Sequence, residues 1–271
     1  MSSQIYRLGF IGAGKLAGSV IRGLIRTNFC APGDIIASEP NEQTRSALKR
    51  AVGIQLTAQN QEVAQNAETI FVGVKPAMVL SVLREFSPAL NNKLIVSLAA
   101  GVRTGVMEAT SNARFLRALT NIPSAVGKAA TAVARGKRTT DQDVAIAKEI
   151  FGSIGIVVEV NEEQIDAVTA LAGSGPAFVY TVIEALAAGG VRMGLPEDVA
   201  MKLATQTVLG AAQLMSETAM SPEELRGKVV TPGGTTAAGL AAMEKLGASH
   251  SLIAAVEAAT KRGQEMAREN L

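Results

Sequence analysis

Short apolar runs alternate with segments of helical spacing through the first half of the chain. Runs that predict strands lie at 7–11, 34–38, 54–56, 69–74 and 94–98. Apolar positions that recur every three or four residues predict helices at 16–26, 44–51 and 78–86, with a helical turn at 62–66. Because apolar strands separated by helices are typical of a covered parallel sheet, we predict an α/β fold for this half.

The pattern changes after residue 123. Strand-like runs at 131–134 and 156–160 flank a helical segment at 141–153, and from residue 162 onward we find only helical spacing. The helices predicted in this last part are 165–172, 177–193, 196–219, 222–225, 236–246 and 249–269. We therefore expect an α/β domain over 1–161 and an all-helical domain over 162–271. The wide apolar faces of these helices fit either a compact bundle or burial against another subunit.

Charge and residue usage exclude several classes of function. The formal net charge is +2, and basic and acidic residues alternate along the chain, so the basic stripe of a nucleic-acid-binding protein is missing. Cys30 and His250 are the only residues of their types, which excludes an internal disulfide and argues against a metal site. A catalytic triad would need His250, and that residue lies in a polar turn.

Two features bear on the location of the protein. The N-terminal residues lead directly into a strand pattern, so we expect no signal peptide. The longest uncharged run, 167–183, is broken by glycine and proline at 173–176 and is shorter than a membrane span requires. We expect a cytoplasmic protein with no membrane partner.

A glycine-rich turn follows the first predicted strand and opens the first predicted helix. Its sequence, Gly12-Ala13-Gly14-Lys15-Leu16-Ala17, fits the pattern G-x-G-x-x-[GA]. The first glycine makes the tight turn, the second lets a pyrophosphate approach the helix N-terminus, and the small third residue allows close packing of helix on strand. This placement predicts a dinucleotide-binding site.

The end of the second predicted strand bears on the choice of dinucleotide. A carboxylate there, Glu39, accepts a hydrogen bond from a ribose 2′-hydroxyl and repels a 2′-phosphate, which favours NAD. The nearby Ser38, Asn41 and Arg45 suit a phosphate instead. Glu39 could also be solvated without meeting the ribose. The sequence therefore leaves the cofactor as NADP(H) or NAD(H).

Two later strands also end in residues suited to a ligand site. Lys75 follows the run at 69–74 and would lie beside the cofactor, although a lysine at a strand end is more often simply solvated. The small residues at 97–101 would leave room for a nicotinamide ring.

The segment 231–236 combines two glycines with hydroxyl side chains ahead of a predicted helix. Its sequence is Thr231-Pro232-Gly233-Gly234-Thr235-Thr236. Bare glycine backbone lets N–H groups approach a ligand, and a helix N-terminus favours an anion such as a carboxylate. A plain turn with a Thr N-cap is the alternative, and these residues alone favour neither.

Seven segments occur in an order that is typical of one enzyme family. They are Gly12-Ala13-Gly14, Val74-Lys75-Pro76, Thr120-Asn121-Ile122-Pro123, Asp166-Ala167-Val168-Thr169, Gly173-Ser174-Gly175-Pro176-Ala177-Phe178, Gly190-Val191-Arg192-Met193-Gly194-Leu195-Pro196 and the segment 231–236. Over essentially its whole length the chain resembles pyrroline-5-carboxylate reductase, which reduces a cyclic imine to proline.

The resemblance implies a Rossmann-like dinucleotide-binding domain at 1–161 and an all-helical substrate and dimerisation domain at 162–271. It implies dimers that often assemble further into rings, and 1-pyrroline-5-carboxylate as the substrate. The cofactor contacts that it implies are Gly12, Ala13, Gly14, Lys15, Leu16, Glu39, Asn41, Asn60, Val74, Lys75 and Ala100. The substrate contacts that it implies are Glu162, Gly234, Thr235 and Thr236, and Thr236 is the expected catalytic residue.

The chain departs from the usual family pattern at four positions. Thr231 stands where Ser is commoner, Phe178 replaces a Tyr, Gly227 replaces an acidic residue, and Glu39 replaces a small polar or basic residue. The change at Glu39 means that a preference for NADPH cannot be assumed.

An imine reductase needs no histidine, because its substrate can enter as the iminium. The Thr236 hydroxyl would bond near the ring nitrogen, and Glu162 would hold the cationic ring unless it is a solvated carboxylate at a helix start. A 3-hydroxy-acid dehydrogenase would need a catalytic lysine, for which Lys202 and Lys228 lack a convincing setting. A nucleotide-binding module without turnover is a further alternative.

Overall fold

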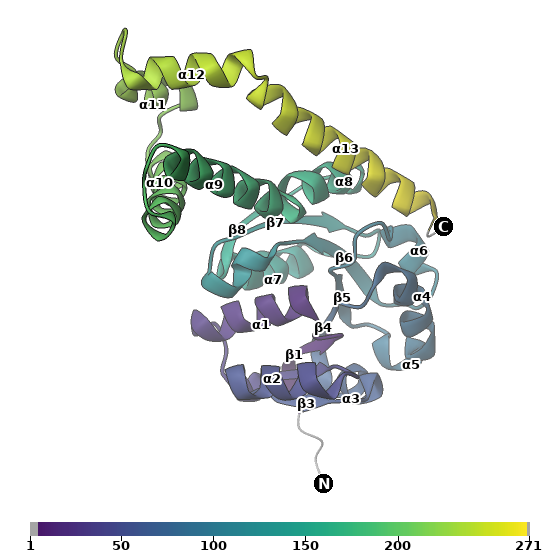
Figure 1. The fold of residues 1–271 in the computed structure, drawn as a ribbon. Coiled ribbons are helices and arrows are strands. Elements are labelled where there is room, and N and C mark those ends of the chain that lie inside the picture. The colour runs from purple at the N-terminus through teal and green to yellow at the C-terminus, as the bar shows by residue number, and fades with distance from the viewer. Residues whose placement is uncertain (1–4, 270–271) are drawn as a thin grey trace. The chain divides into compact units, whose positions relative to one another are not determined.

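The computed structural model describes residues 5–269. Within this range eight strands form one sheet in the order β3-β2-β1-β4-β5-β6-β7-β8 (Figure 1). The strands are β1 (Tyr6–Ile11), β2 (Ile35–Ser38), β3 (Gln55–Thr57), β4 (Ala67–Val72), β5 (Leu94–Ser97), β6 (Arg114–Leu119), β7 (Ala129–Arg135) and β8 (Gly155–Glu159). Neighbouring strands run parallel except β6 and β7, which pair antiparallel.

Helices cover both faces of this sheet, as predicted. They are α1 (Lys15–Arg26), α2 (Glu42–Val52), α3 (Asn60–Asn66), α4 (Pro76–Glu85), α5 (Ser87–Leu90), α6 (Thr104–Glu108) and α7 (Asp141–Gly152). One buried cluster joins β1 to α1 and α7 and includes Phe10, Phe71 and Phe151. A second cluster joins the opposite face to α3 and α4. The predicted α/β class of this half is confirmed.

Strand β6 was missed by the sequence analysis. Its sequence carries two arginines, Arg114 and Arg117, which interrupt the apolar run that marks the other central strands. The strand is nevertheless buried, and it pairs with β5 over Leu94–Ser97. Its position between β5 and β7 places Arg117 inside the protein, where it becomes part of the site described below.

From Glu162 onward the described residues are helical, as predicted. A 3₁₀ turn at Glu162–Gln164 leads into α8 (Ile165–Val168) and a π-helical turn at Thr169–Gly173. The longer helices are α9 (Gly175–Arg192), α10 (Glu197–Glu217), α11 (Pro222–Val229), α12 (Thr235–Lys245) and α13 (Ala248–Glu269).

The chain forms two compact units, which are described separately. The residues up to Ser174 and those from Glu257 onward make up the first, called here the sheet unit. Gly175–Val256 make up the second, the helical unit. The C-terminal part of α13 thus belongs with the sheet, where Gly101, at a φ of +69°, lies close to Met266 and Ala267. The predicted domain boundary between residues 161 and 162 stays a prediction.

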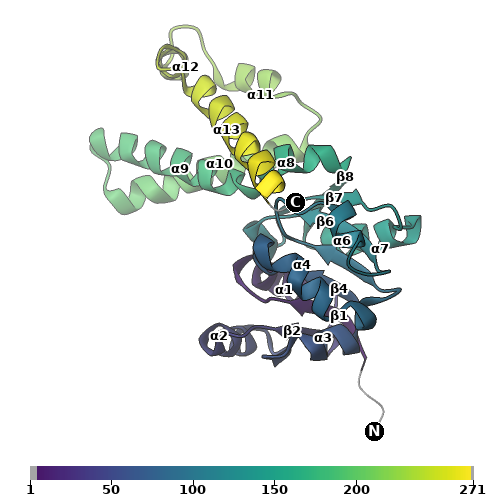
Figure 2. The same ribbon diagram turned by 90° about the vertical axis from the view of Figure 1, so that its right-hand side faces the viewer.

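The helical unit buries few side chains. Helices α9 and α10 lie side by side and pack through Ala187, Ala200 and Ala204, with Ile183 beside them (Figure 2). Many large apolar side chains on its helices are exposed, among them Leu186, Leu203, Leu209, Met243 and Leu252.

One helical run among residues 5–269, Glu162–Arg192, is long and apolar enough to cross a membrane by length and composition alone. It joins the 3₁₀ turn, α8, the π-helical turn and α9. A single run of this kind is weak evidence for a membrane span.

Candidate dinucleotide and substrate sites

The glycine turn lies between β1 and α1, at the carboxyl end of β1. Gly12 adopts a φ of +86°, and a Cβ there would come within 2.9 Å of Val74 Cγ1. The N–H groups of Gly12 and Ala13 both donate to the Ser38 carbonyl, at 3.1 and 2.9 Å. These bonds tie the turn, which follows β1, to the end of β2.

Gly14 is the N-cap of α1, and no side chain caps this helix end. A Cβ on Gly14 would meet no atom within 4 Å, so space lies open beside it. The first helical bond here runs from the Gly18 N–H to the Gly14 carbonyl, which leaves the N–H groups before it to bind a ligand. Open space beside orphan N–H groups at a helix N-terminus fits the pyrophosphate of a dinucleotide.

The third small residue of the motif, Ala17, has the predicted packing role. It is buried, and a Cβ on Gly73 would lie only 2.9 Å from the Ala17 Cβ and 2.7 Å from the Gly12 carbonyl oxygen. Small residues at both positions therefore let α1 approach the end of β4.

The remaining expected cofactor contacts follow the ends of neighbouring parallel strands. Glu39 and Asn41 follow β2, Asn60 begins α3 just after β3, and Val74 and Lys75 follow β4. Ala100 follows β5. The carboxyl ends of parallel strands share one edge of the sheet, so the fold brings these expected contacts to the same edge as the glycine turn.

Lys75 and Asn60 differ in how firmly they are held. Lys75 is exposed and precedes Pro76, the first residue of α4, so its ammonium group is free to move. Asn60 is half-buried, and its Oδ1 accepts a hydrogen bond of 2.7 Å from the Ser38 hydroxyl. With its carbonyl oxygen engaged, Asn60 offers its NH₂ group to a ligand.

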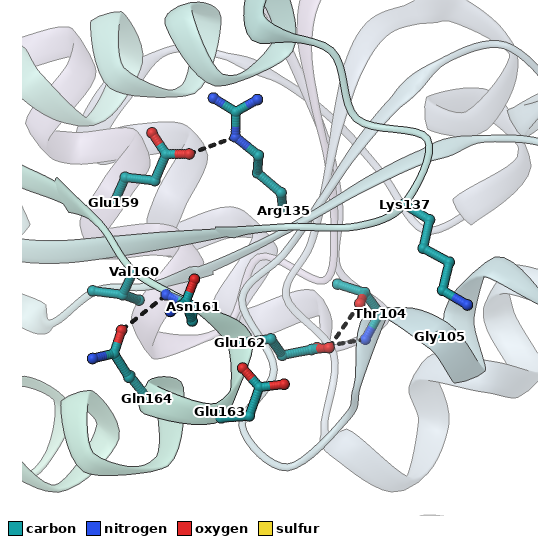
Figure 3. A pocket seen from close by; sticks show the side chains of 10 residues that line it. All are labelled: Thr104, Gly105, Arg135, Lys137, Glu159, Val160, Asn161, Glu162, Glu163 and Gln164. Atoms are coloured by element: carbon teal, nitrogen blue, oxygen red, sulfur yellow. Dashed lines mark hydrogen bonds and ion pairs between the residues drawn. The ribbon is translucent and has the colours of Figure 1, made fainter.

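Glu162 lies in a cavity of about 480 Å³ at the end of β8 (Figure 3). One of its oxygens accepts a 2.6 Å hydrogen bond from the Thr104 N–H, and the other accepts one of 2.8 Å from the Thr104 hydroxyl. The alternative of a solvated carboxylate is therefore wrong, because both oxygens have partners inside the protein. The N–H bond anchors the first residue of α6 to the start of the helical segment.

Arg117 is the functional candidate that the sequence analysis missed. Its side chain is 3% exposed, and its Nη1 pairs with Glu162 Oε1 at 3.3 Å. Its Nε and Nη2 are buried without a hydrogen-bond partner. Burial lowers the pKa of Arg117, and the Glu162 carboxylate opposes that shift. The two arginines, Arg114 and Arg117, inside an otherwise apolar run were the sequence signal that could have revealed it.

The segment 231–236 begins α12 in the helical unit. Gly233 has a φ of +71°, and the Gly234 N–H donates to the Thr231 carbonyl at 2.9 Å. The N-cap of α12 is Gly234, and no side chain caps the helix, so the alternative of a Thr N-cap is wrong. The first bond within the helix runs from the Ala238 N–H to the Gly234 carbonyl, which leaves the earlier N–H groups to bind an anion.

Thr236 lies on the wall of an apolar groove within the helical unit. The groove has a volume of about 380 Å³ and lies between the C-terminal part of α10, α11 and the first turns of α12. Gly234 and Thr236 are half-buried, and Thr235 is exposed. The predicted substrate residues thus fall into two groups, Glu162 in the sheet unit and 234–236 in the helical unit.

Comparison with known proteins agrees with this architecture. Residues 162–266 match the family model for pyrroline-5-carboxylate reductase dimerisation, and residues 7–101 match the model for NADP oxidoreductase, coenzyme F420-dependent. Pyrroline-5-carboxylate reductases from Glycine max and Synechocystis are each 41% identical to the chain, and each alignment covers 97% of it. The alignments cover 97% of the Glycine max protein and 99% of the Synechocystis protein.

The chain belongs to the pyrroline-5-carboxylate reductase family.

Solved structures of pyrroline-5-carboxylate reductases have the same fold. The enzyme from Coxiella burnetii superposes with a TM-score of 0.88 at 32% identity, covering 97% of this chain and 99% of its own. The Plasmodium falciparum enzyme, solved with NADP bound, gives a TM-score of 0.87 at 29% identity over 97% and 98%. The family and fold class expected from the sequence are both confirmed.

The family match also bears on the helical unit. Its residues lie within the segment that matches the dimerisation model, which supports self-association through this part of the chain. Exposed leucines and methionines on α9, α10, α12 and α13 are the kind of surface that a subunit interface buries.

Proposed function

We propose that this protein reduces 1-pyrroline-5-carboxylate to L-proline with NADPH or NADH, the last step of proline biosynthesis. The main support is the glycine turn with open space at Gly14, in a chain that aligns with pyrroline-5-carboxylate reductases over nearly its whole length. A reduced nicotinamide, when bound, supplies the hydride. The cofactor contacts proposed for it are the eleven residues from Gly12 to Ala100 named above.

The substrate carboxylate is proposed to bind at the N-terminus of α12. Uncapped N–H groups beside Gly234 and Thr235 carry the partial positive charge that an anion needs. The Thr236 hydroxyl, in the same turn, would bond near the ring nitrogen and orient the imine. Positioning of this kind is the main contribution that a protein makes to hydride transfer.

The role of Glu162 within this function stays a proposal. Three of the roughly four acceptor positions of Glu162 are taken, two by Thr104 and one by Arg117, so little capacity remains for a direct bond to the cationic ring. The geometry therefore favours Glu162 as a positioning residue that holds Thr104 and Arg117 in place.

A turnover assay tests the proposed reaction. Oxidation of NADPH and NADH is followed with 1-pyrroline-5-carboxylate as the substrate, and reduction of NADP+ and NAD+ is followed separately with 3-hydroxy acids. Proline formation with the cyclic imine supports the proposal. Turnover of a 3-hydroxy acid would favour the alternative dehydrogenase, and binding of dinucleotide without turnover would favour a nucleotide-binding module.

The role of Thr236 is tested by Thr236→Ala, with Thr236→Ser as the variant that keeps the hydroxyl. We expect Thr236→Ala to raise KM for the imine by about 10- to 100-fold, the value of one or two hydrogen bonds to a charged ligand, with unchanged binding of dinucleotide. Thr236→Ser should restore most of the loss. Equal kinetics for the wild type and Thr236→Ala would remove this residue from the site.

Assembly beyond a dimer and the location in the cell are also proposals. Rings of dimers are expected from the family resemblance, and sedimentation equilibrium would measure their size. A cytoplasmic location is supported by relatives in Synechocystis and Methanosarcina acetivorans, and cell fractionation tests it.

A further inference from the structure

The residues after β2 bear on which dinucleotide the glycine turn accepts. NADH and NADPH differ only at the adenosine ribose, which carries a 2′-hydroxyl in one and a 2′-phosphate in the other. A site for the hydroxyl needs an acceptor, whereas a site for the phosphate needs free donors and positive charge. The sequence offers both kinds of group at this point, namely the acceptor Glu39 and the donors Ser38, Asn41 and Arg45.

Ser38 is not available to a phosphate. Its side chain is fully buried, and its hydroxyl donates to Asn60 Oδ1 at 2.7 Å. The same oxygen accepts from the Gly12 N–H at 3.3 Å, so the hydroxyl helps to hold the glycine turn. Binding a phosphate here would require breaking bonds that shape the dinucleotide site itself.

Asn41 and Arg45 are engaged only in part, since the cap at Asn41 uses its Oδ1 and leaves its NH₂ group, the donor that a phosphate would need. The Oδ1 of Asn41 accepts a 2.9 Å hydrogen bond from the Thr44 N–H and thereby caps α2. Arg45 Nη1 donates to the carbonyls of Glu39 and Pro40, at 2.7 and 3.3 Å. These bonds hold one edge of the guanidinium against the backbone of the loop, and they also fix the course of that loop.

Glu39 keeps its capacity to accept. Its N–H donates to the Thr57 carbonyl at 3.0 Å, which ties the residue to the end of β3. Its Oε1 accepts one 3.0 Å bond from the Asn41 N–H, and among residues 5–269 no salt bridge involves its carboxylate. A carboxylate has about four acceptor positions, so one bond leaves it able to receive a 2′-hydroxyl.

We propose that Glu39 is a specificity-determining residue, and that this protein binds NADH in preference to NADPH. The inference rests on the proposed function and names the dinucleotide that serves it. The fold engages the Ser38 hydroxyl and one edge of the Arg45 guanidinium, and it leaves a negative charge at the end of β2. The Plasmodium falciparum relative was solved with NADP, so the preference assigned here rests on these residues alone.

Equilibrium binding of each dinucleotide gives the direct test, because it does not depend on turnover. Titration calorimetry should give a Kd for NADH about 10- to 100-fold below that for NADPH, the value of one charge-assisted hydrogen bond gained and one like-charge contact avoided. Equal affinities, or tighter binding of NADPH, would overturn the proposal.

Variants at Glu39 separate the two parts of the effect. Glu39→Gln keeps an acceptor and removes the charge, so NADPH binding should improve while NADH keeps a weaker, neutral hydrogen bond. Glu39→Ala also removes the acceptor, so the preference should shrink to within about 3-fold or invert. Glu68→Gln is the matched control, since Glu68 is an exposed carboxylate near the start of β4 and away from the carboxyl ends of the strands. If Glu68→Gln changed the affinities for NADH and NADPH as much as the Glu39 variants do, a local role of Glu39 would be contradicted.

Arg45→Ala tests whether the unengaged edge of that guanidinium binds a phosphate. If it does, the variant loses NADPH affinity much more than NADH affinity, and the proposal fails. If NADPH affinity falls no further than NADH affinity, the assignment of Arg45 to the loop stands.

The reductase assay distinguishes a failure of the NADH preference from a failure of the proposed function. Selective binding of NADH without turnover of the imine would refute the proposed function and leave the preference intact. Turnover with NADPH at a kcat/KM equal to that with NADH would refute the preference and leave the function intact.

Discussion

The sheet unit and the helical unit differ in the kinds of side chain that they bury. The sheet unit buries aromatic and branched side chains on both faces of β1 and β4, and Phe10 stacks on Phe71 with ring centroids 4.6 Å apart. The helical unit buries mainly Ala187, Ala200 and Ala204, while leucines along α10 stay exposed. The first unit has a core of its own, and the second presents apolar surface that a partner subunit can cover.

This difference shows where each part obtains its free energy of folding. Burial of large apolar side chains is the dominant stabilising term, and alanines contribute little area. A helical unit with such a small core depends on association, and the dimerisation model that matches residues 162–266 fits this dependence. The substrate site proposed at the start of α12 would then be stable only in the assembled protein.

The largest expected effect comes from the core of the sheet unit. Phe71→Ala removes a fully buried ring that stacks on Phe10 and meets Phe151 edge-on at 5.9 Å. We expect the free energy of unfolding to fall by about 3–5 kcal/mol. Urea unfolding followed by circular dichroism measures it. A loss below about 1 kcal/mol would show that the sheet unit lacks the tight core inferred here.

The second effect concerns association through the helical unit. Leu203→Glu and Leu209→Glu, made separately, place a charge on exposed apolar positions of α10. We expect at least one of them to weaken self-association by about 100-fold, because a charge buried in an interface loses its hydration. Sedimentation equilibrium measures this. Ile5→Glu changes an exposed apolar residue of the sheet unit and should leave association unchanged.

A third effect separates binding from folding at the glycine turn. Gly14 has an ordinary negative φ and open space around it, so Gly14→Val should fold normally and place its side chain where we propose that the pyrophosphate binds. We expect Kd for the dinucleotide to rise by about 10- to 100-fold with little change in Tm. Gly12→Val should lower both binding and Tm, because its φ is +86° and its Cβ meets Val74.

The smallest expected effect is a pH dependence of the stability of the sheet unit. Asp143 is buried at the start of α7, where it accepts from Arg114 and Thr140. Burial alone would raise the pKa of Asp143, but these hydrogen bonds outweigh burial and hold the pKa below its ordinary value. A carboxyl with a lowered folded-state pKa contributes stability that is present above its unfolded-state pKa, about 4, and is lost as the pH falls through the folded-state value.

Urea unfolding between pH 7 and pH 3 tests this dependence. We expect Asp143→Asn to cost about 1–3 kcal/mol at pH 7, the value of hydrogen bonds to a charged group, and to flatten the acid limb of the stability curve. Asp141→Asn is the matched control, because Asp141 is an exposed carboxylate on the same helix turn. Parallel curves for wild type and Asp143→Asn would contradict the role given to Asp143.

Hydrophobic periodicity predicted most helices and strands because their buried positions follow a regular apolar pattern. Strands buried on both faces are mostly apolar, as at 94–98 where Ser97 is the one polar residue, and α1 and α10 show regular helical spacing. Strand β6 was not predicted because Arg114 and Arg117 break its apolar run, although each arginine forms an ion pair with a carboxylate in the folded protein. Local pattern cannot reveal partners that lie 29 and 45 residues away.

The sequence by itself determined the family, the two kinds of architecture and the glycine turn, since short motifs with fixed spacing specify local backbone geometry. Tertiary structure alone decided which polar groups remain free for a ligand. It engaged Ser38, Asn41 and Arg45 in the loop after β2 while leaving Glu39 able to accept, and it gave both oxygens of Glu162 to Thr104. The physical reason is that a side chain's availability depends on hydrogen bonds between distant segments, and these exist only once the chain has folded.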